Sequence, residues 1–146
     1  MLAEECASLE QQLASLLEEI GTSLPSLPGL GTLGATELLV EVGDPRRFRS
    51  ADAFASYTGT APIPASSAEA RGHPVHHRLN RFGNRRLNSV LYSMAIVRVR
   101  MHAETQAFVA RALAAGKTKR DALRILKRRL ARLVWLTMMR DLATCA

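Results

Sequence analysis

The stretch 118–142, TKRDALRILKRRLARLVWLTMMRDL, predicts one long helix with an apolar stripe on one side and a basic face on the other. Its apolar residues recur every three or four positions, which is the period of an α-helix. The apolar positions are Leu123, Leu126, Leu130, Leu133, Val134 and Leu136, and the basic ones are Arg120, Arg124, Lys127, Arg128 and Arg132. The basic face is either a solvated surface or a surface for phosphate, and the excess of arginine over lysine favours phosphate.

Helical periods dominate upstream of this stretch as well. Helices are predicted over about 32–42, 51–57, 84–101 and 105–115. Gly43-Asp44-Pro45 is a stop signal after the first of these, and Ser50 is an N-cap for the second. Residues 60–82, here called the serine loop, contain three of the six prolines and no sustained period, so they predict one long irregular loop with room for brief strands. The predicted fold class is all-α, a helical bundle interrupted by this loop and ending in basic helices over 84–144.

The N-terminal residues 1–21 predict a separate helical arm. Its apolar residues follow the 4-3-4-3-4 spacing of a heptad repeat at Leu2, Cys6, Leu9, Leu13, Leu16 and Ile20. Such a seam is typical of a short coiled coil that pairs with itself or with another helix. It is equally typical of an amphipathic helix that packs on its own domain. Residues 22–146 are predicted to form one further domain, and a homo-oligomer through the arm is expected.

Charge is divided abruptly along the chain. Residues 1–45 carry eight acidic side chains and no lysine or arginine, whereas residues 46–146 carry all 20 basic side chains and five acidic ones. The second part therefore has a formal charge of about +15 (20 − 5). Clustered cations of this kind favour a nucleic-acid partner, because phosphate neutralisation releases counterions.

The composition disfavours several other classes of protein. No apolar run is long enough for a transmembrane helix, and the acidic N-terminus is unlike a signal peptide. The two cysteines, Cys6 and Cys145, lie at opposite ends of the chain and indicate neither a disulfide framework nor zinc pairing. A cytoplasmic protein with no membrane partner is therefore expected.

Leu27-Pro-Gly-Leu-Gly31 predicts the hairpin of a helix-hairpin-helix motif that spans about 24–43. Glycines there permit a tight turn and expose backbone N–H groups at a helix N-terminus, which suit a DNA phosphate. The predicted phosphate contacts are Gly29, Gly31 and Thr32. The alternative is a purely scaffolding hairpin, because residues 21–45 contain no basic side chain.

The serine loop brings hydroxyls, histidines and arginines into one stretch of sequence. A serine hydroxyl can attack a phosphodiester while arginines neutralise the charge of the transition state. The candidate catalytic residues are Ser66, Ser67, Arg71, Arg78, Arg81 and Arg85, and Arg86 beside them is a candidate nucleic-acid contact. No cysteine lies near the loop's three histidines, His73, His76 and His77, so solvated or phosphate-facing histidines are favoured over a metal site.

Five segments occur along the chain in the order in which a known family has them. They are Leu27–Gly31, Gly43-Asp44 with Arg47-Phe48 and Ser50, Ala53–Gly59 with Pro62, Ser67-Ala68 in place of a Ser-Gly pair, and Arg78–Leu87. Together they resemble the C-terminal domain of the insertion sequence 110/116/902 transposase family. The resemblance covers nearly the whole chain from Leu24 onward.

This resemblance implies an RNA-guided DNA recombinase, in which a ribonuclease-H-like domain with four acidic metal ligands precedes a coiled coil and the present domain. It implies that Ser67 is the nucleophile, with Ser66 as the neighbouring alternative. Divalent metal is then expected only in the N-terminal domain, and no cofactor in this chain. DNA and a guide RNA are the expected partners, and the isolated chain is expected to bind nucleic acid without exchanging strands.

Two other functions stay open from the sequence. One is a non-catalytic helix-hairpin-helix module that binds nucleic acid. The other is a structural oligomerisation domain whose basic face is incidental. The salt dependence of nucleic-acid binding separates this last function from the others.

Overall fold

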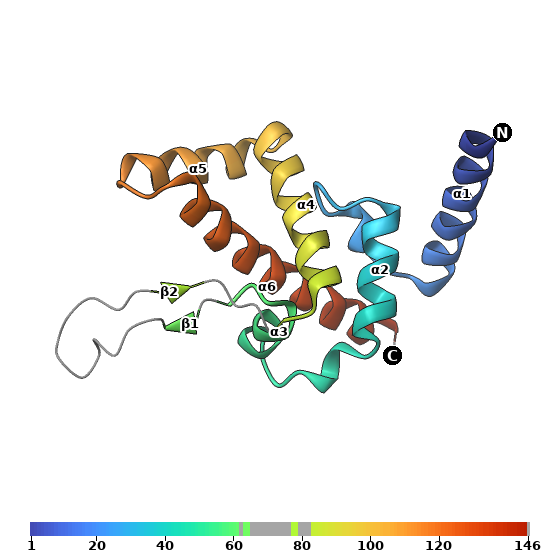
Figure 1. Ribbon diagram of the computed structural model, residues 1–146. Coiled ribbons are helices and arrows are strands. Elements are labelled where there is room, and N and C mark those ends of the chain that lie inside the picture. The colour runs from blue at the N-terminus through green and yellow to red at the C-terminus, as the bar shows by residue number, and fades with distance from the viewer. Residues whose placement is uncertain (62, 65–76, 79–82, 146) are drawn as a thin grey trace.

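The computed structural model describes residues 1–61, 63–64, 77–78 and 83–145 of the 146-residue chain (Figure 1). Its α-helices are α1 (Leu2–Ile20), α2 (Thr32–Val42), α3 (Ala51–Thr58), α4 (Arg85–Met101), α5 (Ala103–Ala114) and α6 (Lys119–Cys145). The other described elements are the 3-10 helices η1 (Leu24–Ser26) and η2 (Pro45–Arg47) and the strands β1 (Ile63–Pro64) and β2 (His77–Arg78). The predicted all-α fold is confirmed, with two brief strands inside the serine loop. Within the ranges that the structure describes, no helix is long and apolar enough to cross a membrane.

Capping side chains set where helices begin. Ser50 begins α3 as predicted, because its Oγ accepts a hydrogen bond from the Ala53 amide at 3.1 Å. α5 begins at Ala103 rather than at the predicted Thr105, because His102 Nδ1 accepts a hydrogen bond from the Thr105 amide at 3.3 Å. Histidine is not among the residue types that normally signal an N-cap, so this start could not be predicted from the sequence.

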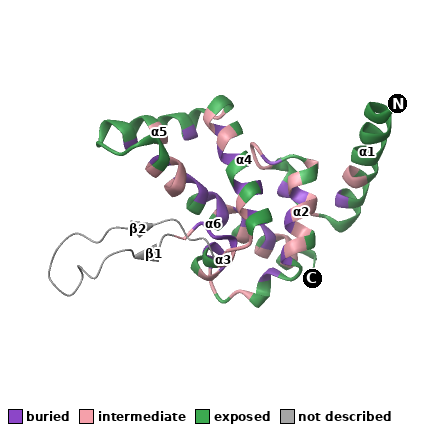
Figure 2. Cartoon of the chain, in the orientation of Figure 1, coloured by how far each residue is buried: buried purple, intermediate pink, exposed green. Residues whose placement is uncertain are grey.

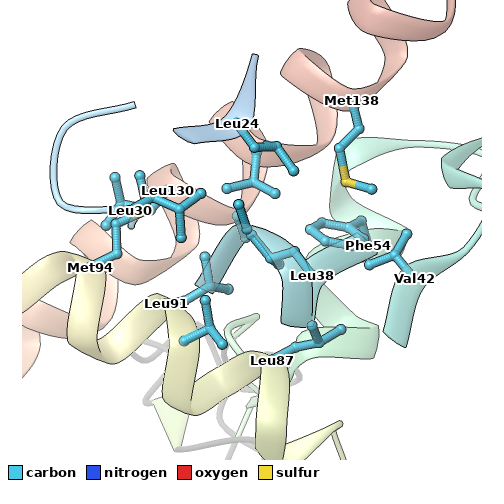
Figure 3. Close-up of a cluster of buried hydrophobic side chains, with 14 of the residues drawn as sticks. Leu24, Leu30, Leu38, Val42, Phe54, Leu87, Leu91, Met94, Leu130 and Met138 are labelled. Carbon is cyan, nitrogen blue, oxygen red and sulfur yellow. The ribbon is translucent and has the colours of Figure 1, made fainter. Parts of the chain in front are cut away.

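α6 is the central helix of the core. It packs against α3, α4 and α5 and against both 3-10 helices. Side chains from η1, the hairpin, α2, α3, α4 and α6 meet in the cluster of Figure 3, which includes Leu24, Leu30, Leu38, Val42, Phe54, Leu87, Leu91, Met94, Leu130 and Met138. Burying one such side chain contributes about 1.5–3 kcal/mol, so this cluster is what holds the helices together.

The apolar stripe predicted for 118–142 faces this core over most of its length. Leu126, Leu130 and Val134 are buried, but Leu136 is 39% exposed. Leu136 lies two residues beyond Val134, which is about 200° around a helix of 3.6 residues per turn. It therefore leaves the stripe, and its inclusion among the core positions was wrong.

Residues near the end of α6 form hydrogen bonds with the segments on either side of α2. The Asp141 carboxylate accepts hydrogen bonds from the Ser23 amide at 2.9 Å, from Ser23 Oγ at 2.7 Å and from Thr22 Oγ1 at 3.3 Å. One and a half turns earlier, Trp135 Nε1 donates to the Pro45 carbonyl oxygen at 3.1 Å. α6 therefore holds both η1 and η2 in place.

α1 stands at the edge of the molecule and contacts α2 (Figure 1). Its buried residue is Leu17, which lies off the predicted heptad seam. The large seam residues Leu2, Leu9, Leu16 and Ile20 are between 52% and 78% exposed, and the helix is exposed over most of its surface (Figure 2). The arm thus packs on its own domain through Leu17, and the described chain leaves the seam uncovered.

Candidate nucleic-acid interface

The serine loop leaves and rejoins the helical core at one place, here called the neck, made of Tyr57, Gly59, Gly83 and Asn84. The Asn84 amide donates a hydrogen bond to the Tyr57 carbonyl oxygen at 2.7 Å. Gly83 lies so close to Gly59 that a Cβ on Gly83 would overlap the Gly59 backbone. Beyond the neck, β1 and β2 pair antiparallel. The two ends of the serine loop are therefore held side by side.

Lys127, a predicted nucleic-acid contact, has a buried side chain. It is 8% exposed, its ammonium donates to Asn88 Oδ1 at 3.1 Å, and Asn88 Nδ2 donates to the Gly59 carbonyl oxygen at 3.1 Å. The ammonium also lies 5.9 Å from the centre of the Tyr92 ring. Burial, and after it the charge of Arg124, lowers the pKa of Lys127. We therefore remove Lys127 from the candidate DNA contacts, because its cation is hydrogen-bonded inside the fold to Asn88, which in turn bonds Gly59 of the neck.

Tyr57 of the neck lies among cationic and amide donors. The Arg47 guanidinium carbon is 4.8 Å from the centre of the Tyr57 ring, and Asn84 Nδ2 is 3.5 Å from the Tyr57 hydroxyl oxygen. Hydrogen bonding from Arg47, and then from Asn84, lowers the pKa of the Tyr57 phenol. Glu41 accepts a hydrogen bond from Asn84 Nδ2 at 3.0 Å and pairs with the predicted contact Arg86 at 3.2 Å. Sequence reasoning did not assign Arg47 to this site, although the residue falls in one of the segments that carry the family resemblance.

Four arginines of α6 recur at intervals of four residues and so share one side of the helix. They are Arg120, Arg124, Arg128 and Arg132, here called the basic stripe. All are exposed except Arg124, which is partly buried. Arg128 pairs with Asp52 at 3.2 Å, and Arg124 pairs with Asp121 at 3.6 Å. Exposed ion pairs contribute about 0–1 kcal/mol each, so phosphates can compete with these carboxylates for the arginines.

The structure describes the predicted catalytic residues only in part. Arg85 is the first residue of α4 and is exposed, directly after the neck. Arg78 lies on β2. Outside the described residues are Ser66, Ser67, Arg71 and Arg81. In the part of the chain that is described, no three histidine, cysteine, aspartate or glutamate side chains gather as metal ligands.

The hairpin turn has the backbone conformation that its glycines predict. Gly29 has a φ of +85°, in the left-handed region that favours glycine. Gly31 is extended, α2 begins at Thr32, and no side chain caps the N-terminus of this helix. A groove beside the turn is lined by Glu10 and Glu37 among its residues. The predicted contacts Gly29, Gly31 and Thr32 line the same groove, and its carboxylates disfavour a phosphate there because like charges repel.

Comparisons with known proteins agree on one family. Residues 21–110 match the Transposase IS116/IS110/IS902 family. The chain is 35% identical over 142 residues to the insertion element IS110 uncharacterized 43.6 kDa protein of Streptomyces coelicolor, which covers 94% of this chain and 34% of the relative. It is 35% identical over 117 residues to the insertion element IS900 uncharacterized 42 kDa protein of Mycobacterium paratuberculosis, with 80% of this chain and 28% of the relative covered. It is 34% identical over 110 residues to the pilin gene-inverting protein of Moraxella bovis, with 73% of this chain and 33% of the relative covered.

The chain spans about a third of the length of these relatives. The family match begins at the end of α1, contains the hairpin, the neck and the serine loop, and reaches into α5. It thus covers the described elements around the hairpin and the neck, whereas α6 with the basic stripe lies beyond the matched residues. The chain belongs to the IS116/IS110/IS902 transposase family.

Proposed function

We propose that this chain is the DNA-handling part of a transposase and acts in DNA transposition. The observation that carries the proposal is the basic stripe, which lines up four arginines on one side of the longest helix. Regularly spaced exposed cations suit the phosphates of a DNA backbone. Membership of a transposase family supports the same role. An activity on DNA would fit the expected cytoplasmic location, and cell fractionation tests that location.

We also propose that the serine loop carries the nucleophile, Ser67, with Ser66 as the alternative. The serine oxygen attacks the phosphorus of a DNA phosphodiester and forms a phosphoserine ester, while the phosphorus–oxygen bond to one DNA end breaks. The serine loses one proton and the departing DNA oxygen takes one up, which leaves a free hydroxyl on that DNA end. Arginines neutralise the charge that develops on the phosphate oxygens. Those assigned to this role are Arg71, Arg78, Arg81 and Arg85. The neck supports the assignment, because it holds both ends of the loop together directly before Arg85.

Further parts of the reaction are assigned to other elements. The hairpin at Gly29, Gly31 and Thr32 binds a DNA phosphate through backbone N–H groups, and Arg86 adds a contact beside the neck. Strand exchange requires an N-terminal region of the kind implied by the family resemblance, together with a guide RNA. Any divalent metal belongs to that region, and no step in this chain runs through it. The isolated chain binds DNA without exchanging strands.

Removing the basic stripe tests the DNA-binding role. Replacing Arg120, Arg124 and Arg128 together by alanine is expected to weaken binding to duplex DNA about 10- to 100-fold at about 0.1 M salt. The slope of log affinity against log salt should fall by about one for each phosphate contact that is lost. Fluorescence anisotropy with labelled duplex at several salt concentrations measures both quantities. The matched control replaces Arg111, Lys117 and Arg140, which are exposed elsewhere, and should change affinity less than about threefold.

Each rival explanation predicts a different result in the binding assay or in an assay of recombination. Affinity that barely changes between low and moderate salt would favour a structural oligomerisation domain. Equal losses in the two triple variants would mean that overall charge, not the basic stripe, binds DNA. Salt-dependent binding by a complete protein that never recombines DNA would favour a non-catalytic binding module.

We propose that α1 pairs with a second copy of itself through its exposed heptad seam. Leu9 and Leu16 are more than half exposed on that seam, and burying them between two helices removes apolar surface from water. The double substitution Leu9→Lys and Leu16→Lys is expected to shift the chain from dimer to monomer in sedimentation velocity. Gln11→Lys with Ser15→Lys adds the same charge to exposed positions off the seam and should leave the dimer intact. A wild-type chain that sediments as a monomer at about 100 μM, roughly a hundredfold above a micromolar dissociation constant, contradicts the pairing.

A further inference from the structure

Arg98, in the last turn of α4, is a buried cation. It is 7% exposed, and its Nε is buried with no hydrogen-bond partner among the residues that the structure describes. No carboxylate in the described ranges comes within ion-pair distance of its guanidinium. Burial lowers the pKa of Arg98, while the more distant charge of Glu104 opposes that shift. Since arginine stays charged in proteins, the fold holds a positive charge that it does not neutralise.

A buried charge without an ion-pair partner destabilises the fold, because the charge loses its hydration and gains no compensating interaction. Buried ions are therefore usually paired, and their donors are usually hydrogen-bonded. A guanidinium has five N–H donors in a planar fork, which match the oxygens of a phosphate or carboxylate. An anionic ligand would therefore complete the surroundings of Arg98.

The hairpin turn lies directly against Arg98. A Cβ built on Gly29 would come within 3.0 Å of Arg98 Cγ and 2.7 Å of the Met94 carbonyl oxygen. The positive φ of Gly29 and this close approach together require glycine at the position. In the described part of the chain, the amides of Gly29 and Gly31 make no backbone hydrogen bond. Two backbone N–H groups without a backbone partner and the unpartnered Arg98 Nε thus belong to one small region of the fold.

We propose that Arg98 and the hairpin turn bind one phosphate of a DNA backbone together. The site presupposes the DNA binding proposed above, and Arg98 is its new element. Arg98 supplies from α4 the positive charge that residues 21–45 of the hairpin region lack. The groove that Glu10 and Glu37 line also includes Gly29, Gly31 and Thr32 but not Arg98, so Arg98 meets the turn from outside that groove.

Arg98→Met tests this site, because methionine keeps the length of the buried stem and removes the charge. The variant is expected to melt about 2–4 °C higher than the wild type, since replacing an unpaired buried ion by an apolar side chain is neutral or stabilising. It is expected to bind duplex DNA about tenfold more weakly, with a salt slope smaller by about one. Arg140→Met removes the same charge from an exposed position of α6 and should change neither the melting temperature nor the affinity by a comparable amount.

The outcomes separate the new site from the DNA binding on which it rests. Wild-type protein that binds DNA with a steep salt dependence, together with Arg98→Met that binds as tightly as Arg140→Met, overturns the site and leaves DNA binding standing. Wild-type protein with no salt-dependent affinity overturns both. Loss of stability and affinity together in Arg98→Met, with both restored in the uncharged variant Arg98→Gln, shows a structural role and overturns the site.

Inorganic phosphate distinguishes the two sources of the ligand. Melting curves in phosphate and in chloride at equal ionic strength should show stabilisation by phosphate in the wild type and less in Arg98→Met. DNA should compete with inorganic phosphate, because both occupy the same donors. Phosphate stabilisation that DNA does not displace would mean that the site takes a free anion instead of a DNA backbone, which overturns the proposal.

Discussion

Replacing Ser67 by alanine is expected to reduce strand exchange at least about a thousandfold while leaving DNA affinity within about twofold of wild type. Without the hydroxyl, no oxygen of this loop position can form a covalent bond to the phosphorus. The arginines and the basic stripe remain, so substrate binding is retained. Loss of reaction without loss of binding is the signature of a nucleophile, and it separates a catalytic serine from a serine that merely contacts DNA.

The measurement joins the chain to the N-terminal region of a similar insertion-element protein and supplies a guide RNA. Recombination between two DNA sites is then compared for wild type, Ser66→Ala and Ser67→Ala. Ser66→Ala is the matched control, since it removes the same atom one residue away. Full activity in Ser67→Ala with loss in Ser66→Ala transfers the role to Ser66. Activity in the double variant excludes a serine of this pair as the nucleophile.

The second large expected effect is a loss of stability when a glycine of the neck is replaced. Gly83→Ala is expected to lower the free energy of unfolding by at least about 3 kcal/mol, or to prevent folding altogether. Its Cβ would overlap the Gly59 backbone and lie 2.8 Å from the Thr58 carbonyl carbon. These neighbours are main chain, so relief requires the end of α3 and the start of α4 to move apart. Urea denaturation followed by circular dichroism gives the free energy.

Gly31→Ala is the control for this experiment. A Cβ at Gly31 meets nothing within 4 Å, and its φ of −90° suits alanine. Its expected loss is about 1 kcal/mol or less, the ordinary effect of changing an N-cap residue. A Gly83→Ala variant no less stable than Gly31→Ala would mean that the neck can open freely. The serine loop would then have no fixed base, and the catalytic assignment would lose its structural support.

Periodicity predicted the helices well, because each buries one face in a common core. The stretch 118–142 has its buried leucines where the helical period places them, apart from Leu136. The start of α5 could not be predicted, since it depends on a histidine acting as a cap at His102. The heptad pattern correctly indicated a helix in α1, but the packing of that helix depends on Leu17, which the seam does not contain.

The candidate site was predictable in composition but not in arrangement. Lys127 and Arg98 look like surface cations in the sequence, yet both are nine-tenths buried. Only their contacts in the folded protein distinguish these two residues from surface cations. Lys127 is hydrogen-bonded to Asn88, which lies 39 residues away in the chain, and Arg98 packs against Gly29 of the hairpin turn. No local rule connects positions so far apart. The proposed nucleophile, Ser67, rests on the resemblance of the serine loop to a family and lies outside the described residues.

The bonds between Asp141 and Ser23 span 118 positions of the sequence. During synthesis on the ribosome, α6 emerges after every described element that it covers. Until then Leu24, Leu38 and Phe54 have no α6 side chains to pack against, and the nascent chain exposes them to water. The tertiary structure therefore cannot be completed before α6 has been synthesised.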